Sequence, residues 1–598
     1  MDPVELEHVI GFSGDHANVV CCHPRDPRCV LVGMGRNVVL QNLDDDHDQK
    51  FLQGHDEAVS AVAVSANGTF VASGQEGSKR SAVPEAEIIV WDLAQQVDVY
   101  RLRGIRGGVR SVGFSSDEMF LAGSGMDGSL FIWDMQTGEL LANMSTNNVT
   151  TSLKWDVPRP GDNPRRPEYL LYATVGHQVM SFRLRYSVAS MQYQVQEEPF
   201  RLPAGLVREY MDCTLSPCGE MLMLCTSVGD VNVYQISSQV YRASFPLCSG
   251  GAQTIHSEGP FVFVGGGDGT IKRLVGQGAD WRLDNEISVQ GSVSSLTSSR
   301  DEHSITLVAG TTSGNVYTID ANTMAVVREI KSESQGLVAV AFKRGSSVDE
   351  VLAGFESGAV RAFDARKGGG RQVWEIAVAH RDGVSSLCST HLFYATGGLR
   401  GGVRLWSRTS KSQLFEFSDH ISRPVTGLLP DVKQAHLLHS CGADKCVFTY
   451  DLKKERRMVQ HQWRDGGVLT ALTQRLDSEN ELLTAGTDGC LLTWDCDVEH
   501  PVSQVQVHGQ ALGFSCVQVS PLTGHFVAAS STDARVRIWD LATGALVATT
   551  PGNGFVGISA ISWSPDEKQI VAVGEDKCIT VWNFYADAVL QTNEEKHK

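Results

Sequence analysis

The sequence lacks any apolar run that could cross a membrane, because no stretch approaches the roughly 18 consecutive apolar residues that a spanning helix needs. It also lacks a basic, apolar leader, since its first residues, MDPVELE, are acidic. Positive charge is scarce: 51 Lys and Arg face 69 Asp and Glu, a formal net charge of −18. Such a field repels phosphate backbones and acidic membrane surfaces. We therefore expect a cytoplasmic or cytoskeletal protein with no nucleic acid and no membrane among its partners.

Motifs that hold metals, cofactors or phosphates are missing as well. The 14 cysteines include no Cys-x-x-Cys pair, so we interpret them as reduced core thiols. The glycine-rich stretches at 265–269 and 368–370 match neither a P-loop nor a dinucleotide-binding pattern. Histidines 436, 439, 461 and 500 are scattered without the spacing of metal ligands. We expect no metal, no cofactor and no small-molecule substrate.

What the sequence does contain is an internal repeat of about 45 residues. Segments ending in Trp-Asp or Trp-Asn recur at 89–92, 131–134, 492–495, 537–540 and 580–583. The first two tryptophans are 42 residues apart, and the last three are 45 and 43 apart. Aspartates in tight turns recur with the same period, at 444, 488, 533 and 576. The tryptophan-containing segments and the turn aspartates, two independent features, therefore recur with the same period.

Each repeat contains short runs of alternating apolar residues joined by turn residues, as at 59–64, 70–73 and 88–91. Such runs predict antiparallel strands. A four-stranded sheet cannot bury both of its faces alone, so the repeats must stack around an axis into a β-propeller. We read thirteen units, near 8–45, 46–95, 96–138, 139–186, 192–238, 239–277, 279–323, 324–367, 368–410, 411–454, 455–498, 499–544 and 545–587.

Gly54-His55 followed by Trp91-Asp92, and His508-Gly509 followed by Trp539-Asp540, resemble WD40 repeats. Because a WD40 ring typically holds seven blades, the resemblance implies an all-β fold of two tandem WD40-type β-propellers with about seven blades each. Only six units are readable in the second ring. We predict one propeller over 1–323, a second over 324–587 and a disordered tail at 588–598. The segment at 9–12 is expected to close the first ring by joining its last blade.

The WD40 resemblance also implies hydrogen-bonded networks buried inside the blades. A repeated His-Ser-Asp set could be mistaken for a nucleophilic triad, but repetition in blade after blade argues for buried polar groups that satisfy one another. We therefore predict that the protein is not an enzyme and has no catalytic residues. The matching network positions are His55, Ser73, Trp91, Ser124, Asp127, Trp133, Asp488, Trp494, His508, Ser531, Asp533, Trp539, Asp576 and Trp582.

Clusters of basic residues stand out against the acidic background. They are either solvated loops or patches for an acidic protein partner, and their exposure decides between the two. Two insertions, at 75–87 and 156–168, interrupt the repeat and are further candidates for partner binding, because long loops often carry function. The candidate partner-binding residues are Arg101, Arg103, Arg106, Arg110, Arg159, Arg165, Arg166, Lys453, Lys454, Arg456 and Arg457.

Segments at 9–14, 22–24, 51–55, 71–75 and 86–92 resemble the opening blades of the cilia- and flagella-associated family of tandem-propeller WD-repeat proteins. The resemblance implies a structural protein of the cilium or flagellum axoneme, a microtubule inner protein in the lumen of doublet microtubules. Its implied partners are alpha- and beta-tubulin and other microtubule inner proteins. Two alternatives stay open: an actin-interacting tandem-propeller protein that promotes filament disassembly, and a generic WD40 scaffold of a cytosolic complex.

Overall fold

The structure is a computed structural model. It describes residues 4–10, 16, 19–26, 28–43, 45, 48–78, 85–146, 148–156, 168–202, 207–300, 305–330, 337–342, 350–364, 372–390, 392–431, 433–464, 466–474, 481–495, 498, 500–506, 513–531, 535–540, 545–550, 558–564, 566–574 and 578–585. These residues form β-strands and turns and contain no helix, so none that could span a membrane.

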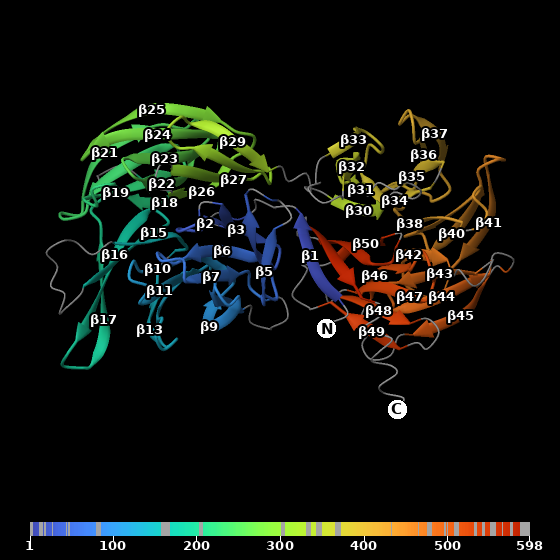
Figure 1. The fold of residues 1–598 in the computed structure, drawn as a ribbon, viewed down its shortest axis with the longest axis horizontal. Helices are drawn as coiled ribbons and strands as arrows, with labels where there is room; N and C mark the ends of the chain where they lie inside the picture. Colours follow the sequence, from blue (N-terminus) through green and yellow to red (C-terminus); the bar gives the residue numbers. More distant parts are fainter. Residues whose placement is uncertain are drawn as a thin grey trace. The chain divides into compact units, whose positions relative to one another are not determined.

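The described strands form thirteen antiparallel sheets of four strands each, which confirms the predicted all-β, blade-like fold. The chain divides into two compact units (Figure 1). The first unit is Gly11–Glu333, and the second unit combines Met1–Ile10 with Ser334–Lys598. In every sheet that lies within one stretch of chain, consecutive strands are neighbours, as short hairpin connections require.

The first unit contains seven sheets among its described residues. Their strands are β2 (Val20–Cys22), β3 (Cys29–Met34), β4 (Asn37–Asn42), β5 (Gln49–Gln53); β6 (Val59–Val64), β7 (Phe70–Gln75), β8 (Glu85–Asp92), β9 (Val97–Arg106); β10 (Val109–Phe114), β11 (Phe120–Gly125), β12 (Ser129–Asp134), β13 (Leu140–Ser145); β14 (Thr150–Trp155), β15 (Tyr169–Val175), β16 (Gln178–Ser187), β17 (Gln192–Pro199); β18 (Tyr210–Leu215), β19 (Met221–Thr226), β20 (Asp230–Gln235), β21 (Val240–Pro246); β22 (Ala252–Glu258), β23 (Phe261–Gly266), β24 (Thr270–Gln277), β25 (Asp280–Ser288); and β26 (Val293–Arg300), β27 (Ile305–Thr311), β28 (Val316–Asp320), β29 (Ala325–Ile330).

The second unit contains six sheets among its described residues. Their strands are β30 (Leu337–Phe342), β31 (Glu350–Phe355), β32 (Val360–Asp364), β33 (Gln372–Ile376); β34 (Val384–Ser389), β35 (Phe393–Gly398), β36 (Val403–Ser407), β37 (Gln413–Phe417); β38 (Val425–Pro430), β39 (Leu437–Gly442), β40 (Cys446–Asp451), β41 (Arg456–Gln462); β42 (Leu469–Gln474), β43 (Glu481–Gly486), β44 (Cys490–Asp495), β45 (Pro501–Gln506); β46 (Phe514–Val519), β47 (Phe526–Ser531), β48 (Val536–Asp540), β49 (Leu546–Thr549); and β50 (Ile558–Trp563), β51 (Gln569–Gly574), β52 (Ile579–Phe584) with β1 (Val4–Ile10).

The first strand of each sheet packs against the first strand of the next, so both units close on themselves. In the first unit this contact runs from β2 to β26 in chain order, and β26 packs back against β2. In the second unit it runs from β30 to β50, and β50 packs back against β30. Each sheet thereby covers both faces with neighbours, and its side chains form apolar clusters with the adjoining sheets.

The segment expected to close the first ring belongs to the second unit instead. Strand β1 pairs antiparallel with β52, from Val4 opposite Phe584 to Ile10 opposite Ile579, and completes the sheet of β50 to β52 (Figure 1). Val9 is buried, and Val4 joins the apolar cluster of this last sheet. The expectation was wrong because β29 already supplies the fourth strand of the first unit's last sheet, which leaves no vacancy there.

The predicted division at 323/324 needs the same correction. Strand β29 follows residue 323 but pairs with β28, so it lies in the first unit. The predicted boundary is wrong because the sequence repeats are offset from the sheets by one strand. The fourth strand of each sheet lies at the start of the next sequence repeat. Strand β5, for example, falls in the repeat read at 46–95 but pairs with β4. The predicted tail at 588–598 lies outside the described residues.

A second kind of interaction joins neighbouring sheets near the axis of each unit. At the second position of several innermost strands, a Ser or Thr hydroxyl donates to a backbone carbonyl of the innermost strand in the next sheet. The sequence analysis did not identify these residues, because one small hydroxyl per repeat is too common to stand out. The bonds are Ser60 to Val109 (2.6 Å), Thr151 to Tyr210 (2.9 Å), Ser385 to Val425 (2.8 Å) and Thr426 to Leu469 (2.7 Å).

Strand β1 generates a first prediction. Val9→Asp places a carboxylate in the buried contact between β1 and β52 and should destabilise the second unit by about 2–4 kcal/mol. Peptide-resolved hydrogen exchange should show lost protection across 558–584, with protection of the first unit unchanged. Glu7→Gln, on the exposed side of the same strand, is the control and should change stability by less than about 0.5 kcal/mol. Loss of protection in the first unit would contradict the assignment of β1.

Candidate functional sites in the blades and on the surface

The network predicted around His55 is assembled in the sheet of β6 to β9. His55 Nε2 lies 2.6 Å from Ser73 Oγ, and Trp91 Nε1 donates to the same oxygen at 2.7 Å. His55 Nδ1 lies 2.9 Å from Gln75 Oε1, so Gln75 occupies the position of the turn aspartate that the insertion displaces. Burial lowers the pKa of His55 to about 4, although its bond to Gln75 opposes the shift. The imidazole is therefore neutral at physiological pH.

The most complete His-Ser-Asp set lies in a sheet that the sequence analysis did not single out. His420 Nε2 lies 2.7 Å from Ser440 Oγ, and its Nδ1 lies 3.0 Å from Asp444 Oδ2. The set was missed because Tyr450 stands where other repeats have Trp, and because Asp419 replaces the glycine that precedes His55. The periodic Asp444 was the one signal of it in the sequence.

Two further tryptophans bond to threonine hydroxyls that the sequence analysis also missed. Trp406 Nε1 donates to Thr396 Oγ1 at 2.9 Å, and His380 Nε2 lies 2.8 Å from the same oxygen. Trp494 Nε1 donates to Thr484 Oγ1 at 2.8 Å. In both pairs the hydroxyl residue stands ten positions before the indole. That spacing is the signal that could have identified them.

In the sheet of β10 to β13 the structure does not join Ser124 with Asp127 and Trp133. Trp133 pairs with Leu121, whereas Trp91 pairs with Val71, so the position equivalent to Ser73 is Gly123. A Cβ atom at Gly123 would lie 3.0 Å from the Trp133 ring. Because side chains alternate between the faces of a strand, Ser124 points to the other face and donates to the Thr150 carbonyl at 3.2 Å.

The turn aspartates mainly bind backbone N–H groups. Asp127 Oδ1 accepts from the Ser129 amide at 3.0 Å, and Asp488 Oδ2 accepts from the Gly467 amide at 2.8 Å. Trp582 Nε1 donates to Thr580 Oγ1 at 3.1 Å, and Trp539 makes an edge contact with Phe514. His508, Asp533 and Asp576 lie outside the described residues, as does the side chain of Ser531.

The Asp444, His420 and Ser440 side chains follow the order of a hydrolase triad, but their burial decides their role. Ser440 and His420 are buried, and the Ser440 hydroxyl lies inside the sheet between β39 and its neighbours. A nucleophile must reach its substrate, so this arrangement satisfies buried polar groups and orders the blade. The same holds for Ser73, whose oxygen is occupied by both His55 and Trp91.

The arginines of the first basic cluster differ in their exposure and in their ion pairs. Arg101 is paired with Asp98 at 2.8 Å and Glu87 at 3.5 Å, and Arg103 is paired with Glu87 at 2.5 Å. Arg110 is half-buried on β10, where burial lowers its pKa and nearby Asp212 partly offsets the shift. Arg106 is exposed. The structure therefore does not bring the four arginines into one free patch.

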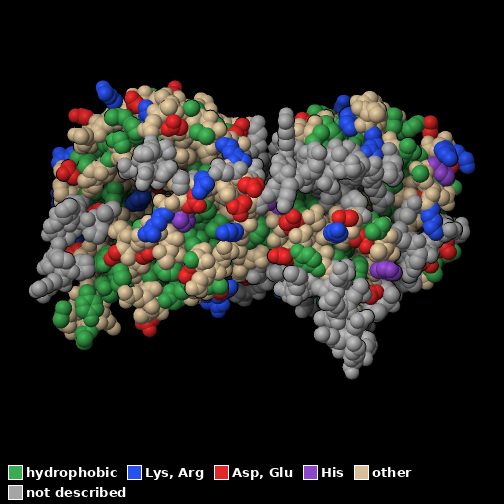
Figure 2. Space-filling view, viewed as in Figure 1, with side chains coloured by type: hydrophobic (Ala, Val, Ile, Leu, Met, Phe, Trp, Pro, Cys, Tyr) green, Lys and Arg blue, Asp and Glu red, His purple; other side chains and the backbone are tan. Residues whose placement is uncertain are grey.

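The second basic cluster, at Lys453–Arg457, is exposed on the β40–β41 hairpin. Lys454 is paired with Asp451 at 3.5 Å and Arg457 with Asp419 at 2.9 Å. Lys453 and Arg456 form no ion pair with a described acidic residue. Figure 2 shows Lys, Arg and His side chains near β37 and β41. Arg159, Arg165 and Arg166, with most of the insertion around them, lie outside the described residues.

An apolar surface that the sequence analysis missed lies at the tip of the β16–β17 hairpin. Strand β16 has ten residues and β17 eight, so the hairpin extends beyond neighbouring six-residue strands such as β14. Its tip exposes Tyr186, Val188 and Met191, and Figure 2 shows hydrophobic side chains gathered there. Exposed apolar groups rarely cluster on a surface without a partner, so this tip is a candidate contact.

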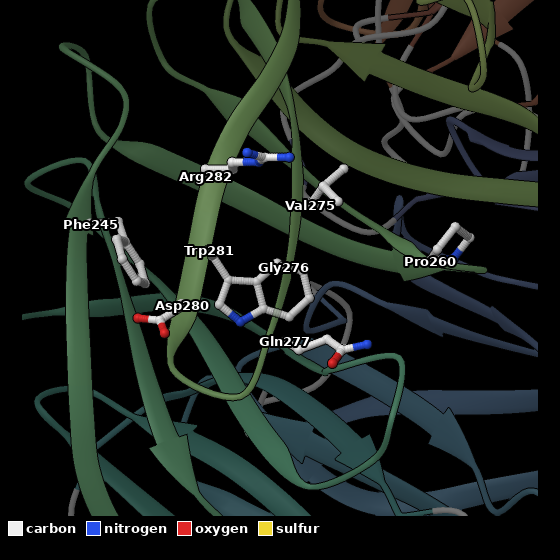
Figure 3. A pocket seen from close by; sticks show the side chains of 8 residues that line it. All are labelled: Phe245, Pro260, Val275, Gly276, Gln277, Asp280, Trp281 and Arg282. Atoms are coloured by element: carbon white, nitrogen blue, oxygen red, sulfur yellow. The ribbon is translucent and has the colours of Figure 1, made fainter.

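A pocket of about 460 Å³ lies at the outer margin of the first unit, between β21 and the β24–β25 hairpin (Figure 3). Its walls include Phe245, Val275 and Trp281, with Asp280 and Arg282 beside them. The Trp281 indole is largely buried and donates to the Gly278 carbonyl at 3.0 Å. The pocket combines apolar side chains with Gln277, Asp280 and Arg282, so it offers a mixed contact surface for side chains.

The family model of the WD domain, G-beta repeat, matches residues 47–81, 96–134, 500–540 and 544–583. The chain contains WD40 repeats. Its curated relatives include cilia- and flagella-associated protein 52 of Chlamydomonas reinhardtii, 24% identical over 98% of this chain and 91% of the relative. The protein of the same name from Mus musculus is 22% identical over 97% of both chains.

A more limited resemblance links this chain to WD repeat-containing protein 1 of Bos taurus, 24% identical over 36% of this chain and 35% of the relative. The cilia- and flagella-associated relatives, by contrast, match nearly the whole chain, degenerate repeats included. This full-length resemblance supports localisation at the cilium or flagellum.

The buried histidines generate a second prediction. Burial holds the pKa of His55 at about 4 in the folded chain, below its ordinary value of 6.5, so between pH 6.5 and 4 the unfolded chain binds a proton that the folded chain does not. Stability should therefore fall as pH drops from 6.5 to 4, by up to about 1.4 kcal/mol per pH unit for each such histidine. His380, with a pKa lowered to about 4 by burial, adds to the slope.

The test compares His55→Asn with the natural protein in urea unfolding, followed by pulsed hydrogen exchange of residues 59–106. The variant should be less stable at neutral pH and should show a shallower loss of stability between pH 6.5 and 4. His177→Asn is a matched control, because His177 is exposed and bonds only to the Arg208 carbonyl. An unchanged slope in His55→Asn would show that His55 is not buried in the neutral form.

Proposed function

We propose that this protein is a non-enzymatic structural component of cilia and flagella, a microtubule inner protein that binds tubulin and neighbouring luminal proteins inside doublet microtubules. The observation that carries the proposal is the resemblance to cilia- and flagella-associated protein 52 over 97–98% of this chain. A match of that extent supports a shared role for both units, whereas matches to single WD40 repeats would support only a shared fold.

The architecture suits a role that depends on adhesion. Each sheet is covered on both faces by its neighbours, and hydroxyl bonds such as Thr426 to the Leu469 carbonyl join successive sheets near the axis. The described sheets of each unit therefore form a frame that does not have to be ordered on binding, which lowers the entropic cost of association. Several modest contacts on one chain produce a long-lived attachment.

The candidate contacts differ in chemistry. Arg106, Lys453 and Arg456 offer exposed positive charge, which suits the acidic surface of tubulin. The hairpin tip of Tyr186, Val188 and Met191 offers exposed apolar area, which suits a groove on a neighbouring protein. Arg101 and Arg103 contribute less, because their charge is already compensated by Asp98 and Glu87.

Fractionation of axonemes tests the proposal. A tagged copy expressed in ciliated cells should remain with isolated axonemes in moderate salt, because luminal contacts are shielded from solvent exchange, and should be released only when the microtubule wall dissolves. An external doublet protein extracted by salt is the control. Release in moderate salt, or cosedimentation of the purified protein with actin filaments in preference to microtubules, would contradict the proposal and favour the actin-interacting alternative.

The same fractionation tests the charged contacts. Lys453→Glu combined with Arg456→Glu should lower the fraction retained in axonemes, because both cations then repel an acidic partner. Arg101→Gln combined with Arg103→Gln, which alters residues that are already paired, should change retention much less. Equal loss in the two double variants would show that the Lys453–Arg457 hairpin is not a specific contact.

A further inference from the structure

A group of arginines lies on one end of two adjacent sheets of the second unit, those of β34 to β37 and β38 to β41. In each antiparallel sheet, the loop that enters the first strand and the loop between the second and third strands are at the same end. The loops at 377–383, 399–402, 418–424, 443–445 and 463–468 therefore share one end. We call this surface the arginine face and define it by Arg381, Arg400, Arg423 and Arg464 with Val378, Leu399 and Ile421.

Backbone hydrogen bonds join these loops into two groups, and the groups abut at Gly401, where a Cβ atom would clash with the His420 carbonyl. The Leu399 amide donates to the Gly383 carbonyl at 3.3 Å, and the Ala443 amide donates to the Pro424 carbonyl at 2.9 Å. The Trp463 amide donates to the Lys445 carbonyl at 2.8 Å, and Lys445 Nζ donates to the Gly466 carbonyl at 2.6 Å. The surface is thus organised before any partner arrives.

The charge of the arginine face is opposite to that of the whole protein. The loops that form this face, at 377–383, 399–402, 418–424, 443–445 and 463–468, hold 5 Lys and Arg against 4 Asp and Glu, whereas the full chain holds 51 against 69. The acidic side chains on this face are already engaged among the described residues: Asp382 with Arg400 at 3.3 Å, Asp419 with Arg457 at 2.9 Å, and Asp444 with buried His420 at 3.0 Å.

Three exposed arginines on this face, Arg381, Arg423 and Arg464, form no ion pair with a described residue. Further acidic residues lie at its borders, at Glu356 in the preceding sheet and Asp488 in the following one, and Asp465, next to Arg464 in the sequence, is outside the described residues. Asp488 is itself occupied by the Gly467 amide at 2.8 Å. The arginines are therefore available to a charged partner.

The turns of this face depart from the pattern in the first unit. Two of the equivalent turns there carry aspartate before a positive-φ glycine, at Asp127-Gly128 and Asp268-Gly269. In the β35–β36 turn the aspartate is replaced by Arg400, whose side chain is 78% exposed. In the β39–β40 turn the glycine is replaced by Lys445, which holds a φ of 64°, a conformation that non-glycine residues adopt only at a cost. Both changes add positive charge to this end of the sheets.

Apolar side chains lie among the arginines. Ile421 is 80% exposed and Val378 61% exposed, and Leu399 is also exposed. Ile421 is two residues from Arg423, and Leu399 is next to Arg400. A surface that combines arginine with exposed aliphatic groups, and whose acidic groups are already paired, has the composition of a protein interface. A site for nucleic acid would instead combine basic residues with exposed aromatic rings.

We propose that the arginine face binds an acidic polypeptide segment that carries at least one apolar side chain. The carboxylates of the segment pair with Arg381, Arg423 and Arg464, and its apolar side chain packs on Ile421 and Leu399. The surface is distinct from the Lys453–Arg457 hairpin, because β40 runs from Cys446 to Asp451 and separates Lys445 from Lys453. The proposal does not depend on the microtubule role.

Fluorescence polarisation with a labelled, glutamate-rich peptide that contains one central leucine tests the proposal. Arg381→Glu, Arg423→Glu and Arg464→Glu together should weaken binding about tenfold or more. The matched control reverses three exposed arginines of the first unit, Arg25, Arg201 and Arg242, and should change binding less than about twofold. Ile421→Ser should weaken the leucine peptide but not a version with serine in its place, and Ile421→Leu should restore binding.

Three outcomes would overturn the proposal. The first is equal loss of binding in the two triple variants, which would indicate a response to net charge alone. The second is an Ile421→Ser effect that is the same for both peptides, which would remove the apolar contact. The third is tighter binding of a single-stranded oligonucleotide of equal charge. Thermal unfolding of each variant, expected to match the natural protein because the changed residues are exposed, separates loss of binding from loss of folding.

Discussion

The structure depends on one constraint: a four-stranded sheet of this composition has two apolar faces, and both must be covered. Neighbouring sheets provide the cover, so stability requires a closed circle in each unit. The first unit closes with strands from one continuous stretch of chain, while in the second β50 packs against β30 and β1, from the far end of the sequence, completes the last sheet. The second unit is therefore held together by both ends of its chain, and Val9 lies in the contact that joins them.

The period of the repeat was enough to predict the strands and the sheets, because period and alternation follow directly from burial on two faces, whereas the expectation of two units came from the resemblance to WD40 repeats. Pairing between strands was harder to predict. Sequence repeats are offset from the sheets by one strand, so the locations of β1 and β29 could not be read from spacing alone. Ser124 shows the same limit on a smaller scale, because a shift of one residue moves a side chain to the opposite face.

The candidate sites divide in a similar way. His55, Ser73 and Trp91 were identifiable because their residue types match the repeat pattern, whereas His420 with Ser440 was obscured by Tyr450. The charged clusters were visible as composition, but pairing depends on three-dimensional neighbours that composition does not reveal. The positive charge of Arg101 is compensated by Asp98, whereas the charge of Arg423 is not compensated by any described residue. Nothing in the sequence distinguishes the two arginines. Polar groups inside the sheets stabilise the fold, and uncompensated groups at the loops and hairpins are left for partners.

Closure of the two circles of sheets is the claim on which the rest depends, and a high-resolution density map of the purified protein tests it most directly. The account predicts seven sheets around one axis and six around the other, with residues 4–10 as the outer strand beside 579–584 in the last sheet. A seventh sheet in the second unit, or residues 4–10 paired with a strand of the first unit, would contradict it.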